Sequence, residues 1–118
     1  MAEKKGYVAT SKFLIASPTK VRPVAHVINQ KSYTEAMAIL ANMPQKGATL
    51  ISATLKSAAA NALNQNSKLD EDMLYVKEIR VDEGPRLKRV WFRARGRADQ
   101  LLKRMCHNTV IVDEKAGE

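Results

Sequence analysis

The chain has 118 residues, 45% of them hydrophobic and 27% charged, and its 20 Lys and Arg against 12 Asp and Glu give a formal net charge of +8. This composition suits one domain and excludes a fully disordered chain; with a single cysteine, Cys106, and two histidines it also excludes a disulfide or four-ligand zinc scaffold. The apolar runs are far shorter than the ~20 residues of a membrane span and the start lacks a signal-peptide pattern, so we expect an intracellular, soluble protein with no membrane partner.

Residues 7–15 are rich in β-branched and aromatic side chains and predict a strand or an extended arm. A helix is expected over residues 18–29, because Ser17 as N-cap followed by Pro18 is typical of a helix start. Pro23 lies about one turn into this helix, where it removes a backbone donor. We therefore expect the helix to be irregular at its beginning.

Two further helices follow. Ser32 and Glu35 have the spacing of a capping box and predict a short helix over residues 33–42. The longest helix is expected over residues 45–64, an alanine-rich segment with apolar residues at helical spacing. Thr54 falls on its apolar stripe, where the hydroxyl can donate to a carbonyl one turn back.

Two strands are predicted in the second half of the chain. Residues 73–82 alternate in polarity, and we expect the buried face of this strand to carry Met73, Tyr75, Ile79 and Val81. Residues 107–113 are rich in valine and isoleucine and predict another strand. The tail from Glu114 is expected to be frayed.

Between these strands, residues 84–105 carry eight cations and one acid, Asp99. Six of the cations are arginines, which form bidentate contacts to phosphate, and Trp91 and Phe92 among them offer stacking faces. The alternative is a solvated basic face, but mutual repulsion within the segment indicates a polyanionic partner. The cations are Arg86, Lys88, Arg89, Arg93, Arg95, Arg97, Lys103 and Arg104.

The conformation of this segment is ambiguous from its residues. A long antiparallel hairpin would have arms of roughly 11 residues, with Arg93, Arg95 and Arg97 on one side and small residues on the other. Alternatively, residues 97–105 show helical spacing of apolar side chains and could form a helix. Periodicity does not decide between the two.

Two groups of residues could suggest a catalytic site, but neither has a suitable arrangement. Cys106 and His107 are adjacent on a predicted strand and would point to opposite faces, so the imidazole is badly placed to activate the thiol. Asp70, Glu71 and Asp72 could suggest a metal-dependent nuclease, but a polar turn before a strand is the better interpretation. We expect a protein that is not an enzyme and has no cofactor or metal.

The motifs GPRLKRVWFRARGRA, SPTKVRPVAHVINQKS, KSAAANALNQN and LYVKEIRVDEGPRLKR occur in an order that resembles the family of universal large-subunit ribosomal protein twenty-two. The resemblance spans most of the chain and favours the hairpin. The sequence departs from the family pattern at three positions: Phe92, where proline is usual, Cys106, where serine is common, and Pro23, where an aliphatic residue is usual.

The resemblance implies an α+β fold over residues 1–118, with three helices packed on a small antiparallel sheet and a long, protruding basic β-hairpin over residues 84–105. It implies a structural constituent of the large ribosomal subunit in the cytoplasm that binds rRNA, supports assembly and lines the peptide exit tunnel. The implied partners are large-subunit rRNA, neighbouring ribosomal proteins and the nascent peptide. The alternative is a free-standing basic regulator of DNA or mRNA with a groove-entering helix at residues 97–105.

Under the ribosomal hypothesis, the hairpin cations and the two aromatic residues contact RNA or line the tunnel, and DNA is not a partner. Basic residues at or near the start of the first helix are expected to bind phosphate, because a helix N-terminus attracts anions. The additional RNA-binding candidates outside the hairpin are Lys12, Lys20, Arg22 and His107.

Overall fold

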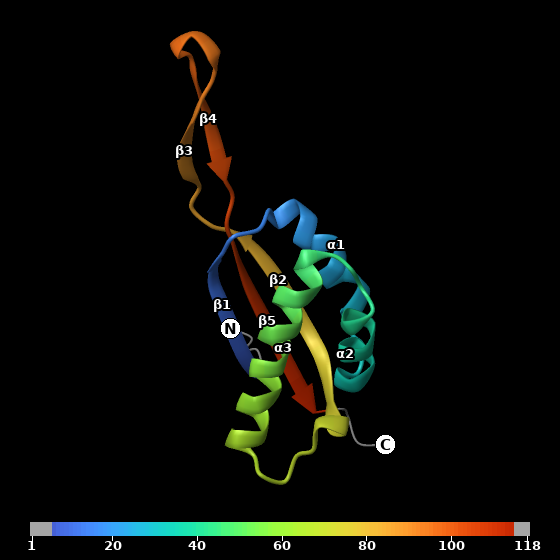
Figure 1. The fold of residues 1–118 in the computed structure, drawn as a ribbon. Helices are drawn as coiled ribbons and strands as arrows, with labels where there is room; N and C mark the ends of the chain where they lie inside the picture. The colour runs from blue at the N-terminus through green and yellow to red at the C-terminus, as the bar shows by residue number, and fades with distance from the viewer. Residues whose placement is uncertain (1–5, 115–118) are drawn as a thin grey trace.

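The computed structural model describes residues 6–114, so residues 1–5 and 115–118 lie outside the described residues. Of the tail expected to be frayed, Glu114 is described, and it ends the last strand, where it pairs with Leu74. It shows three helices on a small antiparallel sheet with a protruding β-hairpin, which confirms the predicted α+β fold (Figure 1). No helix of the described part has the length and apolar character needed to cross a membrane. In chain order, the elements are β1 (Tyr7–Leu14), α1 (Pro18–Ile28), α2 (Tyr33–Ala41), α3 (Lys46–Gln65), β2 (Leu74–Glu83), β3 (Leu87–Phe92), β4 (Ala98–Lys103) and β5 (Cys106–Glu114), with short 3₁₀ turns at Glu71–Met73 and Ala94–Gly96.

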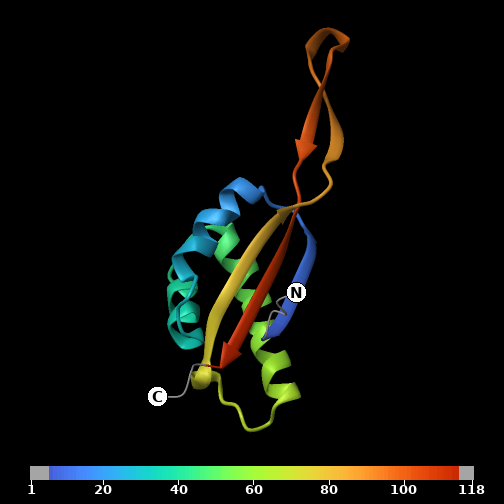
Figure 2. The same ribbon diagram turned by 180° about the vertical axis from the view of Figure 1, so that it is seen from behind.

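We call residues 6–83 and 106–114 the body and residues 84–105 the finger. The body sheet has the order β1-β5-β2, and both pairings are antiparallel. All three helices cover one face of this sheet, and the view from behind shows the strands on the near side (Figure 2). β5 is therefore the central strand of the body sheet. The finger projects from the end of the body where β2 ends and β5 begins.

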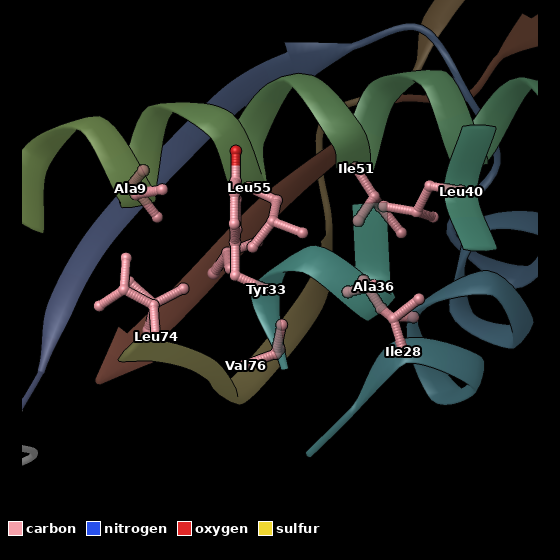
Figure 3. Packing of buried hydrophobic residues seen from close by; sticks show 14 of the residues in the cluster. Ala9, Ile28, Tyr33, Ala36, Leu40, Ile51, Leu55, Leu74 and Val76 are labelled. Atoms are coloured by element: carbon pink, nitrogen blue, oxygen red, sulfur yellow. The ribbon is translucent and has the colours of Figure 1, made fainter. Parts of the chain in front are cut away.

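The core lies between the helices and the sheet. Ile51 and Leu55 of α3 are fully buried, and side chains from α1, α2, α3 and β2 converge in one cluster (Figure 3). Alanines on the same face of α3 leave room for β1 and β5 to approach closely. The predicted stripe of α3 is thus confirmed, and the helix ends within one residue of its expected bounds.

Two local hydrogen bonds predicted from the sequence are present. Ser32 Oγ accepts a hydrogen bond from the backbone N–H of Glu35 at 3.3 Å, as a capping box requires. The Thr54 hydroxyl donates to the carbonyl of Leu50 at 3.1 Å and also lies 2.8 Å from the Ser11 hydroxyl. The expectation for Ser17 was wrong in one respect: its side chain makes no capping bond, and its carbonyl accepts the first bonds of α1 instead.

The predicted buried face of β2 was wrong at its start. Met73 is exposed and precedes the strand, whereas Leu74 and Val76 are fully buried. The register against β5 shifts between Val76 and Glu78, which marks a β-bulge. One extra residue moves the alternation to the opposite phase, so strict period two cannot describe both halves of the strand.

Candidate nucleic-acid interface

The finger is an antiparallel hairpin. β3 pairs with β4 from Leu87 opposite Lys103 to Phe92 opposite Ala98. It extends away from the body along the long axis of the molecule, whose principal extents are 68 × 35 × 22 Å (Figure 1). Residues 98–103 are a strand, so the structure confirms the hairpin and contradicts a helix over residues 97–105.

The arms of the finger are shorter than expected, because the strand ladder is interrupted at the junction with the body. Pairing of β2 with β5 ends at Glu83 opposite Cys106, and one further bond runs from the Gly84 N–H to the Met105 carbonyl at 2.9 Å. Pro85 has no backbone donor to continue the ladder. Pairing resumes at Leu87, and six paired residues per arm replace the predicted eleven.

The tip of the finger, residues 93–97, does not alternate as a strand. Residues 94–96 form a 3₁₀ turn, and Arg95 and Gly96 have φ values of 64° and 73°. The Arg93 N–H donates to the Arg97 carbonyl and closes the turn at 2.6 Å. The expectation that Arg93, Arg95 and Arg97 share one side of a strand was therefore wrong, because the reversal of the chain interrupts the two-residue period.

Arg93, Asp99 and Trp91 form a small cluster beside the tip. Arg93 Nε donates to Asp99 Oδ2 at 2.7 Å, and the Arg93 guanidinium carbon lies 5.8 Å from the centre of the Trp91 ring. The second of these distances is within the range of a cation–π interaction. The acid of the finger thus holds one arginine against an aromatic face, while Trp91 remains 53% exposed.

The two aromatic residues lie on opposite faces of the finger. Directly paired residues of a hairpin share a face, so Phe92 lies with Val90 and Leu102, while Trp91 lies with Leu101. Phe92 is 81% exposed and the other four are also exposed. The finger thus has apolar side chains on both faces and no core beneath either of them.

All eight finger cations are exposed. Arg86 lies 3.8 Å from Glu83 of β2, and Arg93 pairs with Asp99. Arg89 donates to the neighbouring Lys88 carbonyl. Within residues 6–114, no acidic side chain pairs with the five remaining cations, which are Lys88, Arg95, Arg97, Lys103 and Arg104.

The predicted body cations divide into two kinds. Lys12 on β1 and Lys20 in the first turn of α1 are exposed toward solvent. Arg22 is also exposed, but its Nε and Nη2 donate to the Val81 carbonyl at 3.2 and 3.0 Å. Arg22 therefore ties α1 to the end of β2, and part of its hydrogen-bonding capacity is used within the chain.

His107 lies at the root of the finger. Its Nδ1 accepts a hydrogen bond from the Phe13 N–H at 3.0 Å, and the two rings meet edge to face at 5.0 Å. Phe13 has a φ of 60°, which is unusual for an aromatic residue, at the register shift between β1 and β5. Phe13 could not be identified from the sequence, because a left-handed aromatic residue within a strand pattern has no sequence signature.

Cys106 and His107 point to opposite faces of β5, as predicted. Cys106 is fully buried and His107 is half-buried. Burial raises the pKa of the Cys106 thiol, against the lowering effect of the positive charges of Arg22 and Lys46. A nucleophilic cysteine needs a lowered pKa and access to solvent, and Cys106 has neither.

Asp70 to Asp72 fall at the predicted polar turn, where residues 71–73 form one 3₁₀ turn before β2. In the described part of the chain, no three Asp, Glu, His or Cys side chains are grouped so that they could hold a metal ion.

An α+β body with an exposed, arginine-rich finger has the features of the class of small basic nucleic-acid-binding proteins. Residues 9–113 match the family described as "Ribosomal protein L22p/L17e", and the chain belongs to this family. Its role is therefore that of a structural, non-enzymatic ribosomal protein.

Relatives support this assignment over the full length of the chain. The chain is 74% identical over 118 residues to "Large ribosomal subunit protein uL22" of Treponema denticola, with all of both chains covered. It is 59% identical over 114 residues to the protein of the same name from Treponema pallidum, covering 97% of this chain and 92% of that one. The corresponding protein of Borreliella afzelii is 52% identical over 115 residues, covering 98% and 96%.

Proposed function

We propose that this chain is a constituent of the large ribosomal subunit that binds large-subunit rRNA, supports subunit assembly and lines the nascent-peptide exit tunnel with its finger. The observation that carries the proposal is the finger itself, a protruding hairpin with eight exposed cations and one acid. Its place of action is the ribosome of the cytoplasm, and residues 1–118 act there as one unit.

Electrostatics supports RNA as the partner of the finger. Six of its eight cations have no acidic partner among the described residues, and like charges along a narrow hairpin repel one another in the free chain. Phosphates placed around the finger would remove this repulsion and release counterions. The finger cations are therefore proposed to contact phosphates, as is Lys12 on the body.

The exposed apolar residues of the finger support contacts beyond phosphates. Trp91 and Phe92 present rings on opposite faces, so a hairpin inserted between RNA segments can stack on a base with one face and border the tunnel with the other. The nascent peptide and neighbouring ribosomal proteins are the proposed protein partners. Arg22 and His107 are assigned to the edge of the RNA interface, because both also make contacts within the chain.

The proposal can be tested by reconstituting large subunits with the chain in which Arg93, Arg95 and Arg97 are replaced by Ala. We expect this variant to be depleted from subunits after a high-salt wash, because three cationic contacts are lost. The matched control replaces the exposed cations Lys56, Lys68 and Arg80 of the body by Ala. Equal retention of both variants would contradict the proposed role of the finger.

The alternative of a DNA- or mRNA-binding regulator depended on a groove-entering helix at residues 97–105. Of those residues, 97 ends the tip, 98–103 form β4, and 104–105 connect β4 to β5. No other observation on the described residues favours this alternative, and we do not propose it.

A further inference from the structure

An open groove of about 760 Å³ lies on the body between α1 and the start of α3. Its lining is mostly apolar and comes from the connection before α1, from α1 itself and from the residues around the start of α3. Val27, which lines the groove, is 43% exposed, so this apolar surface faces solvent. The main apolar lining residues are Ala16, Pro23, Val24, Val27 and Met43.

The floor of the groove is fixed by close packing of two helices. A Cβ atom added at Gly47 of α3 would lie 3.3 Å from Val21 Cα and 3.6 Å from Val24 Cγ2 of α1. α1 and α3 therefore meet through a glycine, and both helices begin at the end of the body from which the finger projects (Figure 1). Pro23 is part of the apolar wall of the groove. Because proline has no backbone N–H, one carbonyl in the preceding turn of α1 receives no helical hydrogen bond.

Positive charge is concentrated at the end of the groove where the two helices begin. Lys20 and Lys46 both line it, and Lys46 Nζ donates to the Ile15 carbonyl at 2.6 Å. No acidic residue lies in the first turn of either helix, and within residues 6–114 no carboxylate pairs with either lysine. This end of the groove is therefore complementary to a negative group.

The helix starts add backbone donors to the same end. The first bonds of α1 and α3 run from the Lys20 N–H to the Ser17 carbonyl and from the Ala48 N–H to the Gln45 carbonyl. Neither Ser17 nor Gln45 caps its helix with a side chain. The amide groups of Thr19, Lys46 and Gly47 therefore precede the helical bonds and remain available to an acceptor.

We infer that this groove binds a protein segment that places apolar side chains along the α1 wall and a carboxylate at the end marked by Lys20 and Lys46. The apolar lining favours a protein over RNA, whose backbone would leave this surface unmatched, and the two lysines select an acidic segment. The inference depends on the proposed function only for the source of the segment, which would be a neighbouring large-subunit protein.

The inference can be tested on the full chain without ribosomes. The probe is a ten-residue peptide with two leucines four residues apart and two glutamates at its end, added to isotope-labelled protein while backbone NMR shifts are recorded. We expect shifts confined to residues of the groove. A peptide with glutamine in place of glutamate should bind several-fold more weakly, and one with serine in place of leucine should not bind measurably.

Substitutions locate the binding. Lys20→Ala is expected to weaken peptide binding about two- to five-fold, the range of an exposed charge contact, and Val27→Asp, which places a negative charge on the exposed wall, is expected to abolish it. Lys56→Ala, an exposed lysine elsewhere on α3, is the matched control and should leave binding unchanged. Equal binding of the glutamine peptide, shifts outside the groove, or tighter binding of a ten-nucleotide RNA to the same residues would overturn the inference.

A second arm uses reconstituted subunits with a photo-cross-linking residue at Val27 or at Trp91. We expect the Val27 position to cross-link to a protein segment in which mass spectrometry finds an acidic residue beside apolar ones, and Trp91 to cross-link to rRNA. Cross-links from Val27 to rRNA alone would overturn the groove inference and leave the proposed function standing. Failure of the chain to enter subunits would contradict the proposed function, and the peptide experiment would still decide the groove.

Discussion

The body and the finger differ in how they use their apolar residues. In the body, every helix turns an apolar stripe toward the sheet, and residues such as Ile51 and Leu55 have no exposed surface. In the finger, Val90, Trp91 and Phe92 of β3 are all more than half exposed, and neither face of the hairpin covers a core. The core that stabilises the chain therefore lies in the body, whereas the finger has no core of its own.

The largest expected effect tests this division directly. Leu55→Ala should lower the free energy of unfolding by about 3 kcal/mol, because it removes a fully buried side chain and leaves a cavity. Val90→Ala in the finger should change it by less than about 0.5 kcal/mol. Urea denaturation followed by circular dichroism measures both values, and similar losses for the two variants would contradict the division.

The next prediction concerns salt. For binding to a large-subunit rRNA fragment, the triple change of Arg93, Arg95 and Arg97 to Ala should reduce the slope of log affinity against log salt concentration by roughly 2, since each lost phosphate contact removes about 0.7 to 0.9. The thermal unfolding of the isolated chain should stay nearly unchanged. Filter binding at several salt concentrations measures the slope. A large loss of thermal stability in the triple variant would show that the finger contributes to the stability of the body.

Two glycines sharpen the contrast further. Gly47→Ala forces a Cβ against α1 and should destabilise the body by about 1 kcal/mol, as overpacking does. Gly96→Ala meets no atom within 4 Å, and its cost is local strain from a φ of 73° at the tip. Calorimetry should therefore show a lower unfolding temperature of the body for Gly47→Ala and an unchanged one for Gly96→Ala. A shift of that transition by Gly96→Ala would mean that the tip and the body unfold together.

A pH dependence is expected from Cys106. Because burial raises the pKa of its thiol, the folded state keeps a proton that the unfolded state loses as pH rises through the usual thiol range. The free energy of unfolding should therefore fall as pH increases above about 8.5, with a slope of at most about 1.4 kcal/mol per pH unit for one proton. Cys106→Ala should remove this part of the decline. Identical profiles for both chains between pH 8 and 9.5 would contradict the role of the thiol.

The smallest expected effect lies at the tip. Asp99→Asn should release Arg93 and weaken the tip by about 0.2–1 kcal/mol, the range of an exposed ion pair. Hydrogen exchange of the Arg93 amide, which donates to the Arg97 carbonyl, should become faster, while exchange in α3 remains the same. Unchanged exchange at Arg93 would show that the turn holds without the carboxylate.

Much of the body could be predicted from local patterns. The stripe of α3 and the N-cap bond of Ser32 depend on residues close in sequence, and both are present. The phase of β2 could not be predicted, because the bulge before Glu78 is defined only by the register with β5. For the same reason the sequence gives no sign that the Arg22 guanidinium binds the Val81 carbonyl.

The charged residues of the candidate interface could be predicted, but the conformation of the tip that carries some of them could not. Charge counting located all eight cations of the finger. The tip, however, reverses direction through a 3₁₀ turn at residues 94–96, and extrapolated strand alternation placed the three arginines incorrectly. Whether Arg93 faces RNA or Asp99 depends on a cross-strand pair, which residue types alone do not specify.

The interruption of the ladder at Pro85 has a consequence for the order of events during biogenesis. Since the pairing of the body sheet ends with the bond from the Gly84 N–H to the Met105 carbonyl and resumes only at Leu87, the finger is not a continuous extension of that sheet. Under the proposed function, the body can fold on its own contacts, and the finger can take its final position later, when the surrounding rRNA has folded. Under that proposal, the maturing particle and not the polypeptide alone would set the timing of this final step.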